Sequence, residues 1–216
     1  MKTEFSDPVT AGLTRLQKGS LKLYITGAGG IGKTTLSNSL SDRWALHVIN
    51  EQFDANIDRG NKKKTAGECR DEILGIYRTK LAEEEQNTRF ITDRGPLDLL
   101  HLWLHLQLHN YLSKKETTDF LSLAVKQLRS YDFVVILPWN SFPLEQVDQD
   151  RAKLVKRNMN PFSQMKHHVS LMGLVHMFCN KHKIIEVPRK IVALEDRIIY
   201  LERVVNKRLE LMKSDS

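Results

Sequence analysis

A glycine-rich turn between an apolar run and a helical pattern constrains the fold of this chain more than any other feature. The segment LYITGAGGIGKTTL spans residues 23–36, and residues 27–34 match G-x-x-x-x-G-K-[ST] at every fixed position. Glycines allow the backbone to curl so that its N–H groups point at phosphates, and the following helix adds its dipole. The spacing therefore predicts a loop that binds the phosphates of a nucleoside triphosphate.

The residues of this loop have separate expected roles. Lys33 is expected to bridge the β- and γ-phosphates, and the Thr34 hydroxyl is expected to hold Mg²⁺. Thr35 is either a contact of the α-phosphate or an ordinary residue of the first helical turn. We therefore expect ATP to be bound by Gly27, Ala28, Gly29, Gly30, Ile31, Gly32, Lys33, Thr34 and Thr35.

Strand-like and helix-like patterns alternate along the chain. Apolar runs typical of strands cover 21–26, 46–50, 89–93, 132–137 and 183–187. Helical patterns cover 6–18, 33–44, 65–85, 97–112, 115–130, 143–159, 161–181 and about 193–213. This alternation predicts an α/β fold of the P-loop NTPase type, with a parallel sheet of about five strands flanked by helices. The 216 residues fit a single domain, 1–216, with a mobile basic lid at about 145–160.

Charged side chains follow two of the predicted strands. Asp93 ends an apolar run, which is the usual place for a carboxylate that orders Mg²⁺, and Arg94 beside it would point at anionic groups. Glu51 follows the second strand, where it would either accept a hydrogen bond from an acceptor hydroxyl or be a solvated strand end. Ligands of such folds bind at this edge of the sheet.

Positive charge is concentrated toward the C-terminus. Residues 151–216 contain 14 Lys and Arg against 6 Asp and Glu, a net charge of +8, whereas residues 1–150 have a net charge of −1. Arg151 and Arg157 belong to a basic segment that would close over the phosphates and supply charge to the transition state, or would be a solvated helix face. The basic C-terminal third favours an anionic partner, either a nucleotide or a nucleic acid.

These motifs together resemble those of the P-loop nucleoside and nucleotide kinases, in particular the thymidylate-kinase and deoxynucleoside-kinase group. The resemblance rests on GAGGIGKTT, NEQFD, TDRG and the basic segment, and it spans about residues 21–187. It implies an ATP-dependent kinase in which Asp93 lies near Mg²⁺ and Arg94 near substrate phosphates. By the same resemblance Glu51 engages the acceptor hydroxyl, and the lid residues Arg151 and Arg157 clamp the transferred phosphoryl group.

The acceptor stays open at this stage. The family commonly has Tyr or Ser after the Asp-Arg pair, whereas this chain has Gly95. The acceptor is a free nucleoside or nucleotide, or a 5-hydroxymethyl pyrimidine within DNA, which some phage kinases of this group phosphorylate. The basic run RGNKKK at 59–64 would suit such a polymer. A third alternative is an ATPase or nucleotide switch without an acceptor, although no water-positioning glutamate follows Asp93.

Several weaker features complete the expectations. The apolar run 97–112 is short for a bilayer span and is interrupted by Asp98 and three histidines, so it is interpreted as a buried helix. The N-terminus has no secretory pattern, which favours a cytoplasmic protein, or one in the host cytoplasm if a phage encodes it. No membrane partner is expected, and a homodimer is left open.

Histidines recur at two places. His101, His105 and His109 are spaced by four residues, so they form either a metal site or a polar stripe on a packed helix. His167 and His168 either contact ligand phosphates near the lid or lie at the surface. Trp139 either packs in the core or stacks on a base. Cys69 and Cys179 are interpreted as unpaired thiols.

Overall fold

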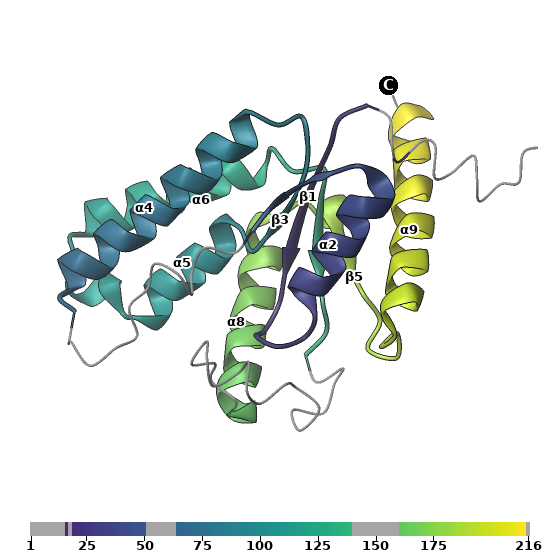
Figure 1. Ribbon diagram of the computed structural model, residues 1–216. Coiled ribbons are helices and arrows are strands. Elements are labelled where there is room, and N and C mark those ends of the chain that lie inside the picture. The colour runs from purple at the N-terminus through teal and green to yellow at the C-terminus, as the bar shows by residue number, and fades with distance from the viewer. Residues whose placement is uncertain (1–15, 17–18, 51–63, 140–159, 215–216) are drawn as a thin grey trace, which may run out of the picture.

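Five parallel strands form one sheet between two groups of helices (Figure 1). The structure is a computed structural model that describes residues 16, 19–50, 64–139 and 160–214. The strands run in the order β2-β3-β1-β4-β5, and every neighbouring pair is parallel. Their bounds are Leu21–Thr26 for β1, His47–Ile49 for β2, Arg89–Asp93 for β3, Phe133–Ile136 for β4 and Ile184–Glu186 for β5. The predicted fold class and strand number are confirmed.

Each helix of the described residues overlaps a helix that the sequence pattern predicts. They are α2 (Lys33–Trp44), α4 (Ala66–Glu85), α5 (Pro96–His105), α6 (Lys114–Leu128), α8 (Pro161–Phe178) and α9 (Leu194–Ser214), with short 3-10 turns η1 (Leu108–Asn110) and η3 (Lys181–Lys183). The expected helix 143–159 and nearly all of 6–18 lie outside the described residues. Within the described ranges, no helix is long and apolar enough to cross a membrane.

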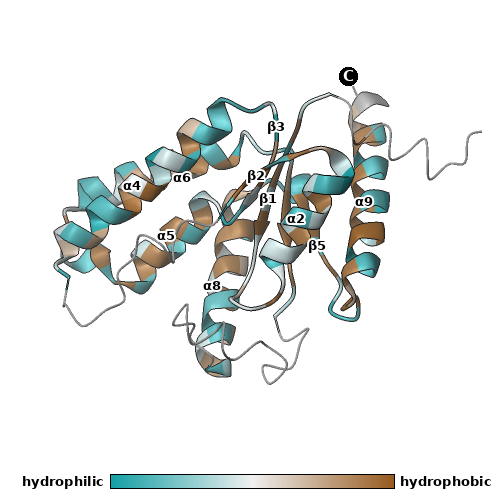
Figure 2. Ribbon diagram, in the orientation of Figure 1, coloured by the Kyte–Doolittle hydropathy of each residue, from teal (hydrophilic) through white to brown (hydrophobic). Residues whose placement is uncertain are grey.

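The sheet separates two hydrophobic cores. Consecutive side chains of a strand point to opposite faces, so β1 contributes to both cores. Tyr24 packs with residues of α4, α5, α6 and α8, whereas Leu23 and Ile25 pack with residues of α2 and α9. Figure 2 shows mainly hydrophobic residues along α5 and α8, which cover the first of these two faces. The central strand β1 is therefore buried on both sides.

Local sequence signals determine where several helices begin. Thr65 and Glu68 form the predicted capping box at the start of α4, in which each side chain bonds the backbone N–H of the other residue. The Asn160 side chain accepts hydrogen bonds from the first turn of α8, and Pro161 occupies its first position.

The predicted helix over 97–112 is wrong in its length. The helix α5 ends at His105, Gln107 adopts a left-handed φ of 56°, and η1 follows. Leu108 is buried in the first core, while Leu104, one helical turn before it, is exposed. A continuous helix would have placed these two leucines on one face, so the break allows Leu108 to return to the core.

The turn after β3 is shaped by a close approach of two residues. A Cβ atom on Gly95 would lie 2.9 Å from two ring carbons of Tyr24, which is fully buried. The ring has little freedom to move, since the Tyr24 hydroxyl donates a 2.6 Å hydrogen bond to Asp98. The large ring on β1 therefore leaves no room for a side chain at position 95.

We predict that Gly95→Ala lowers the free energy of unfolding by about 1–3 kcal/mol, because the added methyl group overpacks a rigid contact. Gly75→Ala is the matched control, since a Cβ atom there meets nothing within 4 Å. Gly75 lies inside α4, so its replacement should raise stability by up to about 1 kcal/mol. Urea unfolding of both variants checks this, and equal stability of the two would contradict it.

Candidate functional site

The loop between β1 and α2 has the backbone shape expected of a phosphate-binding turn. Gly27 and Gly32 have φ values of 140° and 87°, which side chains other than glycine rarely adopt. A Cβ atom on Gly27 would also lie 2.6 Å from Ile31 Cδ1 and 2.9 Å from the Leu137 carbonyl oxygen. Among the described residues, no side chain caps the start of α2, and a helix N-terminus of this kind favours an anion.

Lys33 is folded back onto this loop. Its side chain is only 5% exposed, and its Nζ donates a 2.7 Å hydrogen bond to the Ala28 carbonyl oxygen. The ammonium group therefore lies inside the curl of the glycine loop, at the place where phosphates would bind. Thr35, by contrast, is exposed on the surface of α2.

Thr34 and Asp93 are brought together by α2 and β3. The Thr34 hydroxyl donates a 2.5 Å hydrogen bond to Asp93 Oδ2. Asp93 is fully buried, and its Oδ1 has no hydrogen-bond partner in the described part of the chain. A buried carboxylate oxygen without a partner needs a cation or a donor, and oxygen ligands are those that Mg²⁺ prefers. These two residues therefore fit the Mg²⁺ ion that the loop type implies.

Arg94 has an unusual backbone. Its φ of 61° lies in the left-handed region, which is unfavourable for a residue with a side chain. Two backbone contacts hold it there: Arg94 N donates to the Ile25 carbonyl oxygen, and the Thr92 hydroxyl donates to the Arg94 carbonyl oxygen, each at 3.0 Å. Strained residues concentrate at functional sites, and this one immediately follows Asp93.

Asp98 is the centre of a buried hydrogen-bond network. Its side chain is 1% exposed. It accepts hydrogen bonds from Tyr24 Oη at 2.6 Å, Thr26 Oγ1 at 3.0 Å, the Gly95 backbone N–H at 3.1 Å and Arg94 Nη1 at 3.1 Å. Burial and the neighbouring Asp98 carboxylate raise the pKa of Tyr24, so the phenol remains a donor. The carboxylate thus fixes the direction of the Arg94 side chain.

Asp98 is a site residue that the sequence alone did not reveal. In the sequence it is an interruption of an apolar run, although proline at the first helical position and aspartate at the third are helix-start signals. Those signals predict the helix start, but they do not show that Tyr24 and Thr26 meet the same carboxylate.

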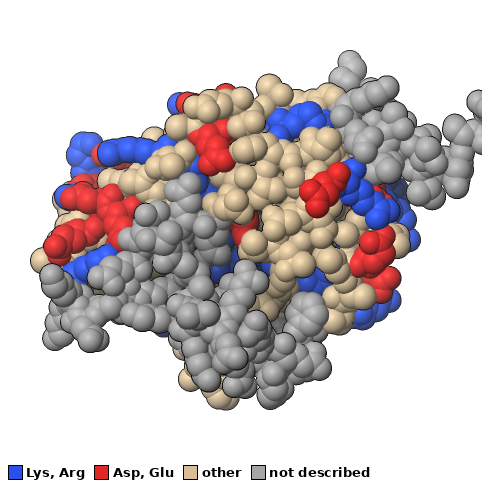
Figure 3. Space-filling model, in the orientation of Figure 1, with Lys and Arg blue, Asp and Glu red and all other residues tan. Residues whose placement is uncertain are grey.

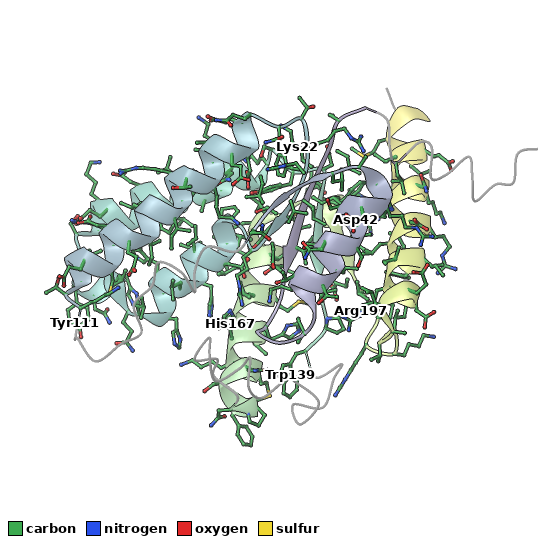
Figure 4. The ribbon with its side chains drawn as sticks, in the orientation of Figure 1. Lys22, Asp42, Tyr111, Trp139, His167 and Arg197 are labelled. Carbon is green, nitrogen blue, oxygen red and sulfur yellow. The ribbon has the colours of Figure 1, made fainter. Side chains whose placement is uncertain are left out.

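Two buried cations also support the site from a distance. Arg197 belongs to the first turn of α9 (Figure 4) and donates to the carbonyl oxygens of Ile31 and Ile191, at 2.9 and 3.1 Å. Lys80 donates to the carbonyl oxygens of Asn50 and Asp93, at 2.9 and 3.1 Å. Each side chain ties together two segments at the carboxyl edge of the sheet.

The histidines form a stack that crosses from α5 to α8. The ring of His101 lies 4.1 Å from that of His167 and 5.8 Å from that of His105, measured between centroids. His109 belongs to η1 rather than to α5, so the expected stripe on one helix is wrong. No group of three or more His, Cys, Asp or Glu residues in the described part of the chain could hold a metal ion.

His167 and His168 are half-buried, and Trp139 packs against the second core. Burial lowers the pKa of His101 to about 4 and that of His167 to about 2, and the second value also reflects the nearby Arg94 and Lys33. Both imidazoles are therefore neutral at physiological pH.

Other predicted site residues lie outside the described residues. These are Glu51, Arg151 and Arg157. Among the described residues, Cys69 and Cys179 are free thiols, as expected. On the face seen in Figure 3, Lys and Arg side chains lie among Asp and Glu side chains, and Arg43 forms ion pairs with Glu195 and Glu202 of α9.

Most of this chain matches the model of one protein family. Residues 22–177 match a family model described as an AAA domain. The chain belongs to this AAA-domain family. The match covers the glycine loop, the Thr34–Asp93 contact and the histidine stack. No curated protein matches the sequence of the chain.

Solved structures share the fold of this AAA-domain protein. A deoxyadenosine kinase from M. mycoides with dCMP and dCDP bound superposes with a TM-score of 0.59 at 14% identity, over 87% of this chain and 100% of that chain. The NadR protein in complex with NR gives 0.60 at 18% identity, over 91% of this chain and 53% of that chain. The YorR protein from Bacillus subtilis in complex with phosphorylated GDP gives 0.51 at 13% identity, over 86% and 97%. This chain spans about half the length of NadR, and all three likenesses are of fold.

We predict that His101 makes the AAA-domain protein sensitive to mild acid. Its folded pKa of about 4 lies below the unfolded value of about 6.5, so its contribution is present above pH 6.5 and is lost as the pH falls toward 4. Between pH 7.5 and pH 5.0 the wild type should lose about 2 kcal/mol more unfolding free energy than His101→Gln.

Chemical denaturation at the two pH values measures this difference. His109→Gln is the matched control, since His109 is exposed on η1 and its replacement should leave the acid sensitivity of the wild type unchanged. An equal loss in His101→Gln and the wild type would show that His101 does not carry the effect.

Proposed function

We propose that this protein is a kinase that transfers the γ-phosphoryl group of ATP to a hydroxyl group of a nucleoside- or nucleotide-type acceptor. The observation that carries the proposal is the contact between Thr34 and Asp93, formed beside Lys33 and followed directly by the strained Arg94. One edge of the sheet therefore has a hydroxyl, a carboxylate with one oxygen that lacks a described partner, and two cations. Phosphoryl transfer needs groups of these kinds.

The donor half consists of the glycine loop and the first turn of α2. The loop N–H groups would cradle the triphosphate, and Lys33 would exchange the Ala28 carbonyl for phosphate oxygens. Mg²⁺ would be held by Thr34 and Asp93, and when bound it would neutralise charge on the phosphates. Arg197 keeps the Ile31 carbonyl turned away from the phosphates, because that oxygen accepts its hydrogen bond.

The acceptor half begins at Arg94. Asp98 takes one side of its guanidinium and fixes its direction, while the side chain remains 11% exposed. In the proposal Arg94 contacts an anionic group of the donor or acceptor. Glu51 would orient the acceptor hydroxyl, and Arg151 and Arg157 would close over the transferred group. Catalysis would come mainly from positioning and charge neutralisation.

The fold comparisons favour a small acceptor over a polymer. The proteins with this fold reported above are described with dCMP, dCDP, NR or phosphorylated GDP bound. The basic run 59–64, which suggested a DNA acceptor, includes Lys64, and this residue forms a 2.9 Å ion pair with Glu72 of α4. A small acceptor is therefore the favoured one. Phosphorylation of DNA, or ATP hydrolysis without an acceptor, would each give a different result in the assay described next.

Incubation with γ-labelled ATP and a panel of acceptors tests the proposal. The panel comprises nucleosides, nucleoside monophosphates, nicotinamide riboside, unmodified DNA and DNA that contains 5-hydroxymethyl pyrimidines. Label in a free nucleoside or nucleotide is the expected result. Label in DNA alone would replace the small acceptor by a polymer, and release of free phosphate with every acceptor unlabelled would identify an ATPase.

We predict that Lys33→Met and Asp93→Asn each lower kcat/KM of this transfer by at least about 100-fold, because each removes charge stabilisation that the transition state requires. Lys115→Met is the matched control, since its side chain is 82% exposed on α6 and pairs only with Asp119 there. Full activity in either site variant, with unchanged folding by circular dichroism, would contradict the assigned roles.

A further inference from the structure

We propose that His167 binds a phosphoryl oxygen of the ligand held near Lys33 and Arg94, through its Nε2 atom, while His101 fixes the plane of its ring. The inference rests on the proposed function only in requiring a phosphorylated ligand at this site. It assigns to α8 a phosphate contact beyond the glycine loop and the basic lid.

The first observation is the place of His167 on α8, near two positive charges. It lies in the second turn of α8, which packs against α5, and it is labelled in Figure 4. Lys33 and Arg94 both act on its charge, so the imidazole shares the electrostatic environment of the phosphate-binding lysine and of the strained arginine. The three side chains come from α2, from the turn after β3 and from α8, and the charges of Lys33 and Arg94 reach the His167 ring.

The second observation is the hydrogen bonding of the His167 ring. Its Nε2 is buried and has no hydrogen-bond partner among the residues that the structure describes. A buried polar atom without a partner lowers stability by about 1–3 kcal/mol, so such atoms in native proteins call for an explanation. A ligand oxygen that completes the hydrogen bond provides one at a site that already holds two cations.

The histidine stack explains how the ring is oriented. His101 lies parallel to His167 within 27° at 4.1 Å between centroids, and it is itself buried, with 6% exposure. Stacking restricts the second torsion of His167, which is otherwise broad for histidine. The Nε2 atom is therefore held in one direction before a ligand arrives.

The charges around the stack favour an anion as the ligand. Lys33 of α2, Arg94 of the turn after β3, and the imidazoles of His101 and His105 on α5 oppose a proton on His167. Asp98 and Lys166 act on His101 with opposite signs. A phosphoryl anion in this region would be attracted by the two cations and would accept a hydrogen bond from Nε2–H. The class of ligand is a phosphate ester or anhydride, either the triphosphate of ATP or a phosphate of the acceptor.

Binding measurements with two replacements of His167 test the proposal. His167→Leu removes the donor, and His167→Gln keeps a side-chain N–H at a similar reach. The matched control is His168→Leu, because His168 is the next residue on the same helix and also has a buried nitrogen without a partner, but has Glu186 as its charged neighbour. Calorimetry gives the Kd of each variant for the β,γ-imido analogue of ATP with Mg²⁺ and for nucleoside monophosphates.

We expect His167→Leu to weaken binding of one of these ligands by about 10-fold or more, His167→Gln to retain it within about 3-fold, and His168→Leu to bind as the wild type does. The sensitive ligand identifies the source of the phosphoryl group. The ¹⁵N shift of His167 Nε2 should move when that ligand is added, which a purely structural role would not produce.

Equal affinities of His167→Leu and the wild type for both ligands would overturn the inference and leave the kinase proposal intact. Conversely, a protein that binds the ATP analogue through His167 but labels no acceptor would support the inference while the kinase proposal fails. A wild type that binds neither ligand would overturn both.

Discussion

The buried carboxylate of Asp98 is the interaction on which the arrangement of the site depends. A charged group in a protein interior is unfavourable unless hydrogen bonds and an opposite charge compensate it, and here two hydroxyls, a backbone N–H and one guanidinium do so. The donors come from β1, from the turn after β3 and from the side chain of Arg94. A single side chain therefore joins the central strand to the segment that carries Asp93 and Arg94.

The same strand positions both halves of the proposed site. The last residue of β1, Thr26, bonds Asp98 and directly precedes the glycine loop, so the loop and Arg94 are held relative to one another through a few bonds. Lys80 and Arg197 add ties between neighbouring segments, because each donates to two backbone carbonyls. Preorganisation of this kind is what phosphoryl transfer requires, since the protein contributes positioning more than covalent chemistry.

Much of the fold could be predicted because local patterns and global structure agree. Five apolar runs, the glycine loop and the caps at Thr65 and Asn160 each have a local physical cause, and the structure has them in place. The closeness of Thr34 and Asp93 follows from the loop type and from strand ends that share one edge. The Tyr24–Gly95 approach, the return of Leu108 to the core and the stacking of His101 on His167 depend on distant segments meeting, and no local pattern encodes such contacts.

In the proposed function, Thr34 and Asp93 hold the metal of a nucleotide bound on the glycine loop. A crystal structure with Mn²⁺ and the β,γ-imido analogue of ATP tests it most directly, because the anomalous signal of manganese locates the ion without reference to the protein. We expect one anomalous peak within about 2.5 Å of Thr34 Oγ1 and beside the Asp93 carboxylate, with the triphosphate on residues 27–35. Nucleotide bound on the loop with the ion away from both side chains, or bound elsewhere on the protein, would contradict it.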